Sequence, residues 1–267
     1  MAIAALKSQV KNIVPRPFIT MVRTVYHFGT ARRCVVCGNR VRHFKPQGFG
    51  YPVLEELQVV GGMYKEDDTC PICYANDRVR LVYLYVRHHS DLLTKPNKLL
   101  HVAPEDGLSA LFLKMPALSY FPADFDGRRY RHIPGLNLVD IQKIQFPDAC
   151  FDWVICNHVI EHVPNDRLAM QELFRVLVPG GRAILQVPLS LKLSQTLEDA
   201  SARSSEDRVR VYGQGDHVRL YANDYYDKLA DVGFSVEKWD AFTTDPLRAA
   251  EWKLNPLEKL CIVTKPA

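Results

Sequence analysis

The chain has 267 residues, of which 47% are hydrophobic and 24% charged, a balance typical of a globular protein with a sizeable core. No apolar run is long enough to span a bilayer as a helix, and the first residues lack the charge order of a secretory signal. We therefore expect a cytoplasmic protein. The net charge of +4 is uneven, since residues 1–54 hold nine Lys or Arg and no acidic residue. This basic front indicates either an anionic partner, such as nucleic acid or phospholipid, or a solvated face without a partner.

Residues 1–30 favour two short amphipathic helices with basic residues opposite their apolar faces. Pro15 and Pro17 separate the two helices, and apolar residues recur at helical spacing in each. We expect the apolar faces to dock on the rest of the protein, with contact to a membrane surface as the alternative. The apolar positions are Ile3, Leu6, Val10 and Ile13 in the first helix and Phe18, Met21, Val22 and Val25 in the second.

Residues 31–95 contain two C-x-x-C pairs and a following helix. The pairs are Cys34-Val-Val-Cys37 and Cys70-Pro-Ile-Cys73, and each has the form of a knuckle that points two thiolates at one ion. Four thiolates fill a tetrahedral site, so we predict a structural rather than a catalytic zinc ion. A redox pair or unpaired thiols are the alternatives. The 32 residues between the pairs must fold back or carry extra strands.

From residue 96 onward, short apolar strands alternate with amphipathic helices. This order predicts an α/β domain over 96–267, with a mostly parallel sheet covered by helices on both faces. The turn at Lys95-Pro96-Asn97 marks its start. Strands are expected at 99–103, 118–123, 151–156, 183–187, 234–239 and 259–264, and helices at 108–115, 165–178 and 224–232.

Three stretches of this domain resemble a known family. They are FPDACFDWVICNHVIEHV at 146–163, ELFRVLVPGGRAILQVP at 172–188 and GQGDHVRLY at 213–221. With the front cysteines, they resemble the class I S-adenosylmethionine-dependent methyltransferases, of type 11, in a bacterial subgroup with a four-cysteine zinc knuckle module. The resemblance implies a Rossmann-like sheet of seven strands, one of them reversed, behind a small zinc-ribbon-like module and N-terminal helices.

The resemblance also implies S-adenosylmethionine as cofactor and a place for it. In open parallel sheets a ligand binds beyond the carboxyl ends of the strands, where the strand order reverses. The family carries an acidic residue and a glycine-rich turn after its first strand. Here His101 replaces the acid, and Ala103, Pro104 and Glu105 replace Gly-x-Gly. We predict cofactor contacts at His101, Ala103, Glu105 and Gly107, and the departure keeps a non-catalytic binding protein as an alternative.

Further cofactor contacts are expected at the ends of later strands. Asp124, with Phe125 beside it, follows the second strand at the distance of a ribose-binding acid, although a turn Asp is the alternative. Asp140 and Ile141 match the family position that meets adenine, with a helix cap as the alternative. Asn157 and His158 follow the predicted strand at 151–156 and are expected to face both cofactor and acceptor.

Three histidines are the candidate catalytic residues: His158, His162 and His217. His158 is the favoured base, because a neutral imidazole accepts a proton near neutral pH. The order H-x-x-E-H at 158–162 lacks a matching third ligand, so we do not expect a metal ion there. Residues 190–220 are polar and are expected to form a lid on the acceptor side, where His217 and Arg219 could contact the acceptor. A surface helical hairpin is the alternative.

The favoured function is methyl transfer from S-adenosylmethionine to an oxygen of a saccharide or glycan precursor. An RNA methyltransferase that grips phosphates with the zinc module and basic arm is a second hypothesis. It is less favoured because aromatic residues are not interleaved with the basic run. A methyltransferase fold that only binds a partner is the third.

Overall fold

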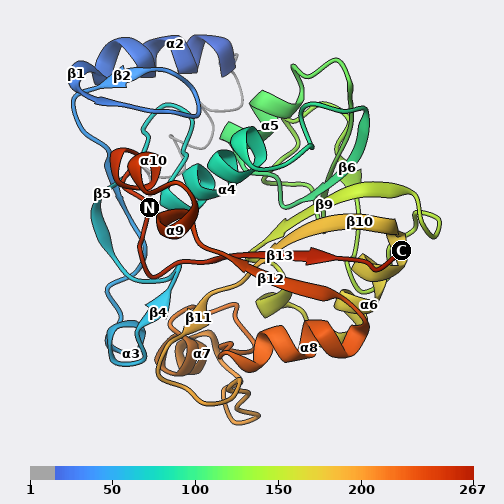
Figure 1. Cartoon of the computed structure of the whole chain (residues 1–267). Coiled ribbons are helices and arrows are strands. Elements are labelled where there is room, and N and C mark those ends of the chain that lie inside the picture. The colour runs from blue at the N-terminus through green and yellow to red at the C-terminus, as the bar shows by residue number, and fades with distance from the viewer. Residues whose placement is uncertain (1–15) are drawn as a thin grey trace.

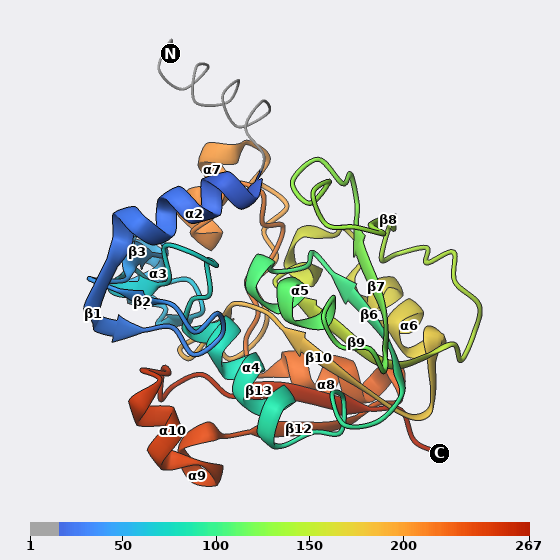
Figure 2. The same ribbon diagram turned by 90° about the horizontal axis from the view of Figure 1, so that it is seen from above.

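A single seven-stranded sheet forms the centre of the computed structural model, which describes residues 16–267. The strand order is β12-β13-β10-β9-β6-β7-β8; Figure 1 labels the strands from β12 to β6, and Figure 2 also labels β7 and β8. The strands are β6 (Asn97–Val102), β7 (Leu118–Asp124), β8 (Asn137–Leu138), β9 (Phe151–Asn157), β10 (Leu177–Gln186), β12 (Ser235–Trp239) and β13 (Leu260–Thr264).

The ladders of this sheet are parallel from β10 through β8, whereas β13 pairs antiparallel with both β10 and β12. The sheet therefore has one reversed strand, which confirms the expected Rossmann-like topology. The order reverses between β6 and β9, because the chain first builds outward through β7 and β8 and then returns to the other side of β6. Their carboxyl ends define the switch point at which such folds bind ligands.

Alternating side chains of each strand enter two separate apolar layers. Leu99, Ile155 and Ile184 belong to one buried cluster, and Leu100, Val154 and Leu185 belong to the other. Both sheet faces are thus covered, which explains why the strands are apolar in continuous runs. Figure 1 shows α4 and α5 above the sheet and α6 and α8 below it. The helices are α4 (Asp77–His88), α5 (Asp106–Phe112), α6 (Asp166–Val176), α8 (Asp224–Val232), α9 (Ala241–Thr244) and α10 (Pro246–Glu251).

The second predicted N-terminal helix is present as α2 (Arg16–His27), followed by the β1 (Phe28–Arg33) and β2 (Arg40–Val41) hairpin. The apolar face of α2 is exposed, with Met21 54% and Val25 72% accessible to solvent. The expectation that this face docks on the rest of the protein was therefore wrong. Figure 2 shows α2 on the opposite side of the molecule from β7 and β8. The first predicted helix lies outside the described residues. No helix within residues 16–267 is long and apolar enough to cross a bilayer.

The segment between the cysteine pairs does carry extra strands, and it extends to the predicted lid. Strands β3 (Lys45–Gln47) and β5 (Lys65–Thr69) pair with each other, while β4 (Val59–Val60) pairs with β11 (Leu189–Ser190). Helix α3 (Pro52–Glu56) contacts α7 (Ser205–Tyr212) of residues 190–220. A small apolar cluster joins the two segments and consists of Leu54, Val59, Ala202, Tyr212 and Leu220.

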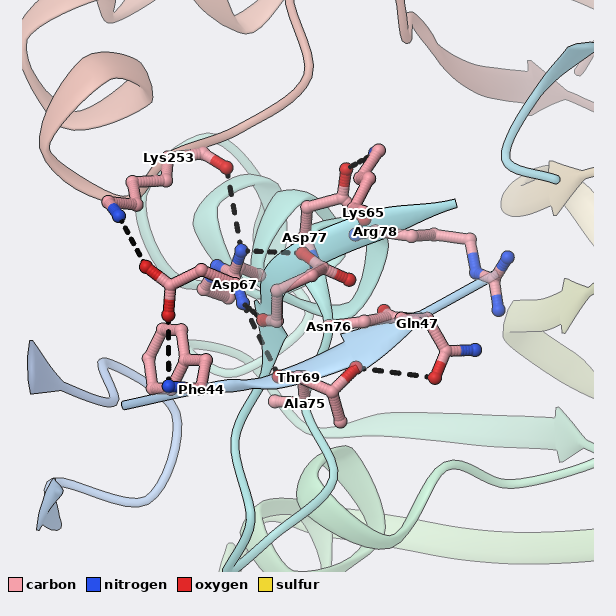
Figure 3. Close-up of polar contacts among 12 residues, drawn as sticks. Phe44, Gln47, Lys65, Asp67, Thr69, Ala75, Asn76, Asp77, Arg78 and Lys253 are labelled. Carbon is pink, nitrogen blue, oxygen red and sulfur yellow. Dashed lines mark hydrogen bonds and ion pairs between the residues drawn. The ribbon is translucent and has the colours of Figure 1, made fainter. Parts of the chain in front are cut away.

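Arg80 on α4 joins the cysteine module to the end of the chain. Its guanidinium is 2% exposed and donates to the Asp68 carboxylate at 3.0 Å, to the Asp68 carbonyl at 2.6 Å and to the Trp252 carbonyl at 2.8 Å. Nearby, Asp67 accepts from Lys253 Nζ at 2.8 Å and from the Phe44 backbone at 2.9 Å, as Figure 3 shows. The module is therefore fixed to residues 252–253 by buried charge and backbone acceptors.

Replacing Arg80 by Met should destabilise the protein by about 3–5 kcal/mol, because it leaves the Asp68 carboxylate buried without its partner. The control is Arg32→Met, which removes the more exposed ion pair to Asp67 and should cost at most about 1 kcal/mol. Urea unfolding followed by circular dichroism measures both. Equal losses in the two variants would show that burial of the Arg80 pair is not what fixes the module.

Gly213 lets residues 190–220, the predicted lid, pack closely against Leu54 of the cysteine module. A Cβ built on Gly213 would lie 2.2 Å from Cδ2 of Leu54. Gly180 has almost the same left-handed φ, 78° against 77°, with no heavy atom within 4 Å of its Cβ position. Both Ala substitutions should pay about 1–2 kcal/mol for the backbone. Gly213→Ala should lose about 1–3 kcal/mol more through overpacking. Equal unfolding midpoints in urea would contradict the close contact with Leu54.

Candidate functional site

The four cysteines of the two C-x-x-C pairs lie together as free thiols. Their Sγ atoms all lie within 4.8 Å of one another, with 3.6 Å between Cys34 and Cys73 and 3.9 Å between Cys37 and Cys70. A tetrahedral zinc ion with Zn–S bonds of about 2.3 Å places its sulfurs about 3.8 Å apart. The observed spacing therefore matches that of a four-thiolate zinc site rather than of two disulfides.

The two pairs adopt the same tight turn. The Gly38 amide donates to the Cys34 carbonyl at 2.8 Å, and the Tyr74 amide donates to the Cys70 carbonyl at 2.9 Å. Tyr74 takes the left-handed φ that Gly38 adopts in the first turn. The Ile72 amide and the Asn39 side chain donate to sulfurs of Cys70 and Cys37, at 3.4 and 3.3 Å. Such N–H···S contacts stabilise thiolates and orient them.

At the switch point, three predicted cofactor residues form one hydrogen-bonded group. Glu105 follows β6 and directs one carboxylate oxygen to His101 Nε2 at 2.7 Å and the other to Asn157 Nδ2 at 3.0 Å. His101 is completely buried, and its Nδ1 lies 3.0 Å from the Tyr120 hydroxyl. Glu105 thereby places a carboxylate at the end of β6. It lies four residues after His101, the position at which the family resemblance expects an acidic residue.

The Glu105 carboxylate is held in its charged form. Burial opposes ionisation, but the hydrogen bonds from His101 and Asn157, together with electrostatic attraction to His101 and Arg78, outweigh it, so the pKa of Glu105 is lowered from its usual value. Negative charge at this edge of the sheet favours a cationic ligand nearby.

Asp124 and Asp140 lie at the ends of neighbouring strands, as predicted. One oxygen of Asp124 accepts from the Gly127 amide at 2.9 Å, and one oxygen of Asp140 accepts from the Gln142 amide at 2.9 Å. Within residues 16–267 the other oxygen of each has no hydrogen bond. Ile141 is buried, whereas Phe125 is 75% exposed.

A shallow depression of about 580 Å³ lies beside these strand ends, between residues 126 and 138. Its lining includes Gly127, Arg131 and Leu138 but none of the predicted cofactor residues. We therefore build the site on the carboxylates at the strand ends rather than on this depression.

The two small residues that follow β6, Ala103 and Gly107, have different surroundings. Ala103 has a left-handed φ of 48°, which bends the chain toward Glu105. Gly107 faces the cysteine module, because a Cβ on it would lie 3.2 Å from Cγ1 of Val36 and 3.4 Å from the Cys73 carbonyl. A cofactor contact at Gly107 stays a prediction, and the contact that the structure shows is with the module.

His158, the predicted base, is bound on its Nε2 side by a residue that the sequence did not single out. Arg78 Nη1 lies 2.7 Å from His158 Nε2. Since a guanidinium only donates, Nε2 accepts and the proton of the neutral ring is on Nδ1. Burial and the charge of Arg78 hold the pKa of His158 well below its usual value. Arg78 gave no signal in the sequence, because its place beside His158 depends on how α4 packs.

Residues 216–219 of the predicted lid pack against the segment that follows β9. Arg219 is 2% exposed and donates to the carbonyls of Ile160 and Pro164 at 3.1 and 3.0 Å. Arg219 thus anchors this segment instead of facing an acceptor, which corrects the expectation. His217 is also buried, and its ring lies 4.7 Å from that of His162.

A family model described as a methyltransferase domain matches residues 124–185, which run from the end of β7 into β10. The matched segment contains Asp124, Asp140, Asn157 and His158, all of them predicted site residues. This match supports the resemblance of the α/β domain to the class I S-adenosylmethionine-dependent methyltransferases.

Two curated methyltransferases are similar to this methyltransferase domain. The 27-O-demethylrifamycin SV methyltransferase of Amycolatopsis mediterranei is 30% identical over 98 residues, 37% of this chain and 34% of that protein. The ubiquinone biosynthesis O-methyltransferase of Psychrobacter arcticus is 28% identical over 130 residues, 48% of each chain. The matches thus span about a third to a half of the relatives' own length.

The fold of the methyltransferase domain also occurs in a solved structure with a different activity. The crystal structure of the [4+2]-cyclase SpnF superposes with a TM-score of 0.50 at 16% identity, over 81% of this chain and 94% of that one. This likeness supports the fold alone.

The residues present fit S-adenosylmethionine. Asp124 and Asp140 each keep one carboxylate oxygen without a hydrogen bond in the described chain, at the ends of β7 and β8. These oxygens could accept hydrogen bonds from ribose hydroxyls and from the adenine amino group. The charged Glu105 carboxylate at the end of β6 suits the cationic amino and sulfonium groups of the cofactor.

Proposed function

We propose that the chain transfers a methyl group from S-adenosylmethionine to a hydroxyl oxygen of a small acceptor. The observation that carries this proposal is the hydrogen-bonded group of His101, Glu105 and Asn157 at the switch point. It restores a charged carboxylate where the sequence departs from the glycine-rich pattern. The names of the two curated relatives, both O-methyltransferases, support oxygen as the methylated atom.

The reaction is an in-line displacement at a sulfonium that is already activated, so the protein mainly positions the acceptor and takes up its proton. Asn157 and His158 close the carboxyl end of β9 and border the acceptor side. His158 can accept this proton once Arg78 leaves Nε2, because the guanidinium occupies that lone pair in the structure. Arg78 is therefore placed to respond to the acceptor's arrival.

A saccharide or glycan precursor is the acceptor class that the subgroup resemblance favours. A nucleic-acid acceptor stays less favoured, because two basic residues of the front segment are engaged within the protein. Arg32 pairs with Asp67 at 2.8 Å, and Arg42 donates to the carbonyls of Tyr26 and Phe28. Contact of α2 with a membrane surface stays a prediction, which its exposed apolar face supports.

We also propose that the four cysteines bind a structural zinc ion. The spacing of the sulfurs and the N–H···S contacts support this assignment, and four thiolates leave no position open for chemistry. Thiolate zinc sites are maintained in a reducing compartment, which supports a cytoplasmic location.

Calorimetry with S-adenosylmethionine and S-adenosylhomocysteine tests the cofactor site. Micromolar binding is expected, and Asp124→Ala should weaken it about 10–100-fold, because a hydrogen bond to a charged group is worth about 1.5–3 kcal/mol. Asp126→Ala is the matched control, since this carboxylate lies two residues away and pairs with Arg128. Absence of binding at millimolar cofactor in folded, zinc-loaded protein would contradict the enzyme proposal.

Metal analysis of the purified chain tests the structural zinc. Cys70→Ser should lose one equivalent of zinc and unfold at a lower temperature, because the binding free energy of a structural zinc is part of the folding free energy. Cys150→Ser is the control, since Cys150 lies outside the cluster, and it should keep its zinc. An unchanged zinc content in Cys70→Ser would rule out the four-thiolate site.

A further inference from the structure

A second group of side chains of the types that can bind a metal ion lies beyond the end of β9. Glu161 and His162 belong to the 3-10 turn η1 (Ile160–His162), and His217 comes from the predicted lid. Each offers one ligand atom, and the three atoms lie within 4.8 Å of one another. The third ligand, which the local sequence H-x-x-E-H lacks, is thus supplied by a residue 55 positions after His162.

Two polar groups of this cluster are buried without partners in the described chain. Glu161 is 1% exposed, and neither of its carboxylate oxygens has a hydrogen bond. His158 Nδ1 is 3.4 Å from one of these oxygens, too long for a good hydrogen bond. His217 is 5% exposed, and its Nδ1 also has no hydrogen bond. A buried carboxylate without donors is costly, and burial raises the pKa of Glu161 to about 7.

The His162 ring is oriented as metal-binding histidines usually are. His162 Nδ1 lies 3.2 Å from the Asp216 carbonyl and 3.5 Å from its carboxylate. Donation from Nδ1 to that carbonyl leaves Nε2 with a free lone pair. A ligating histidine typically donates its other ring N–H to a carbonyl or carboxylate in this way.

The backbone around the cluster is fixed before any ion binds. The Val218 amide donates to the Glu161 carbonyl at 3.0 Å, so the lid segment and the turn η1 are joined directly beside the ligands. The Arg219 guanidinium fastens the same two segments through carbonyls of residues 160 and 164. Such preorganisation lowers the cost of assembling a metal site.

We propose that Glu161, His162 and His217 bind one divalent transition-metal ion. Two imidazole nitrogens and one carboxylate oxygen suit Zn²⁺, Fe²⁺, Co²⁺ or Ni²⁺ better than Mg²⁺ or Ca²⁺, which prefer oxygen ligands. Three protein ligands leave coordination positions open. The binding of this ion is independent of the proposed methyl transfer.

The place of the ion gives it a role that rests on the proposed function. The cluster directly follows Asn157 and His158, which border the acceptor side. An ion with open positions there would bind the acceptor hydroxyl and make it more acidic. The proton of the bound hydroxyl could then pass to solvent water, so that His158 is not needed as the base while Arg78 occupies its Nε2.

Cobalt titration of the full-length protein tests the site, after the four-cysteine cluster has been loaded with one equivalent of zinc and metal analysis has verified that no second equivalent is present. One further equivalent of Co²⁺ should bind and give d–d absorption without thiolate charge-transfer bands. Glu161→Gln and His217→Ala should each weaken it by more than the about 10–100-fold that loss of an outer-shell partner costs. His88→Ala, at the exposed end of α4, is the control and should bind cobalt as the parent does.

Glu161→Gln also separates a ligand from a structural carboxylate. It keeps the side-chain shape and removes the charge, so the metal-free variant should unfold at a temperature equal to or above that of the metal-free parent. Failure of the zinc-loaded parent to bind further cobalt, or full binding by Glu161→Gln, would overturn the proposal. Cofactor binding, measured without added metal, reports on the methyltransferase proposal separately.

Discussion

The buried guanidinium of Arg80 is the interaction on which the arrangement of the two parts depends. It satisfies the Asp68 carboxylate and carbonyls on both sides of the interface, and it stacks over the Phe44 ring with 5.3 Å to the centroid. Removing water from these charges is costly, and only a complete set of partners offsets that cost. The cysteine module therefore has one orientation on the sheet, which sets the position of everything carried on α4.

In this orientation, residues of the cysteine module and of α4 lie directly beside the candidate site. Arg78 lies two residues before Arg80 and reaches His158 from the module side. Gly107, at the start of α5, leaves room for Val36 and the Cys73 carbonyl. The zinc proposed for the cysteines would thus be structural in a specific sense, because it would support the segment that presents the Arg78 guanidinium to His158.

Periodicity predicted the sheet and the helices α4, α6 and α8 because these patterns are local and strong. The strand β8 and the helices α9 and α10 were missed, since two to six residues carry too little periodicity. The predicted strands correctly placed Asp124, Asp140 and Asn157 at the carboxyl edge of the sheet, whereas their contact with the cofactor stays a prediction. The partnership of Arg78 with His158 and the approach of His217 to Glu161 could not be predicted, because each joins segments more than fifty residues apart. Glu105 was predicted as a cofactor contact, but its hydrogen bonds to His101 and Asn157 were not, because they depend on how the turn after β6 folds back.

The route of the chain has a consequence for how the protein is made. The strand β4 pairs with β11, and 172 residues separate Arg80 from the Trp252 carbonyl that it binds. Translation delivers the cysteines early, and a domain generally folds as it emerges. Here the cysteine module is synthesised well before residues 252–253, so its contacts with those residues can form only after they too have left the ribosome.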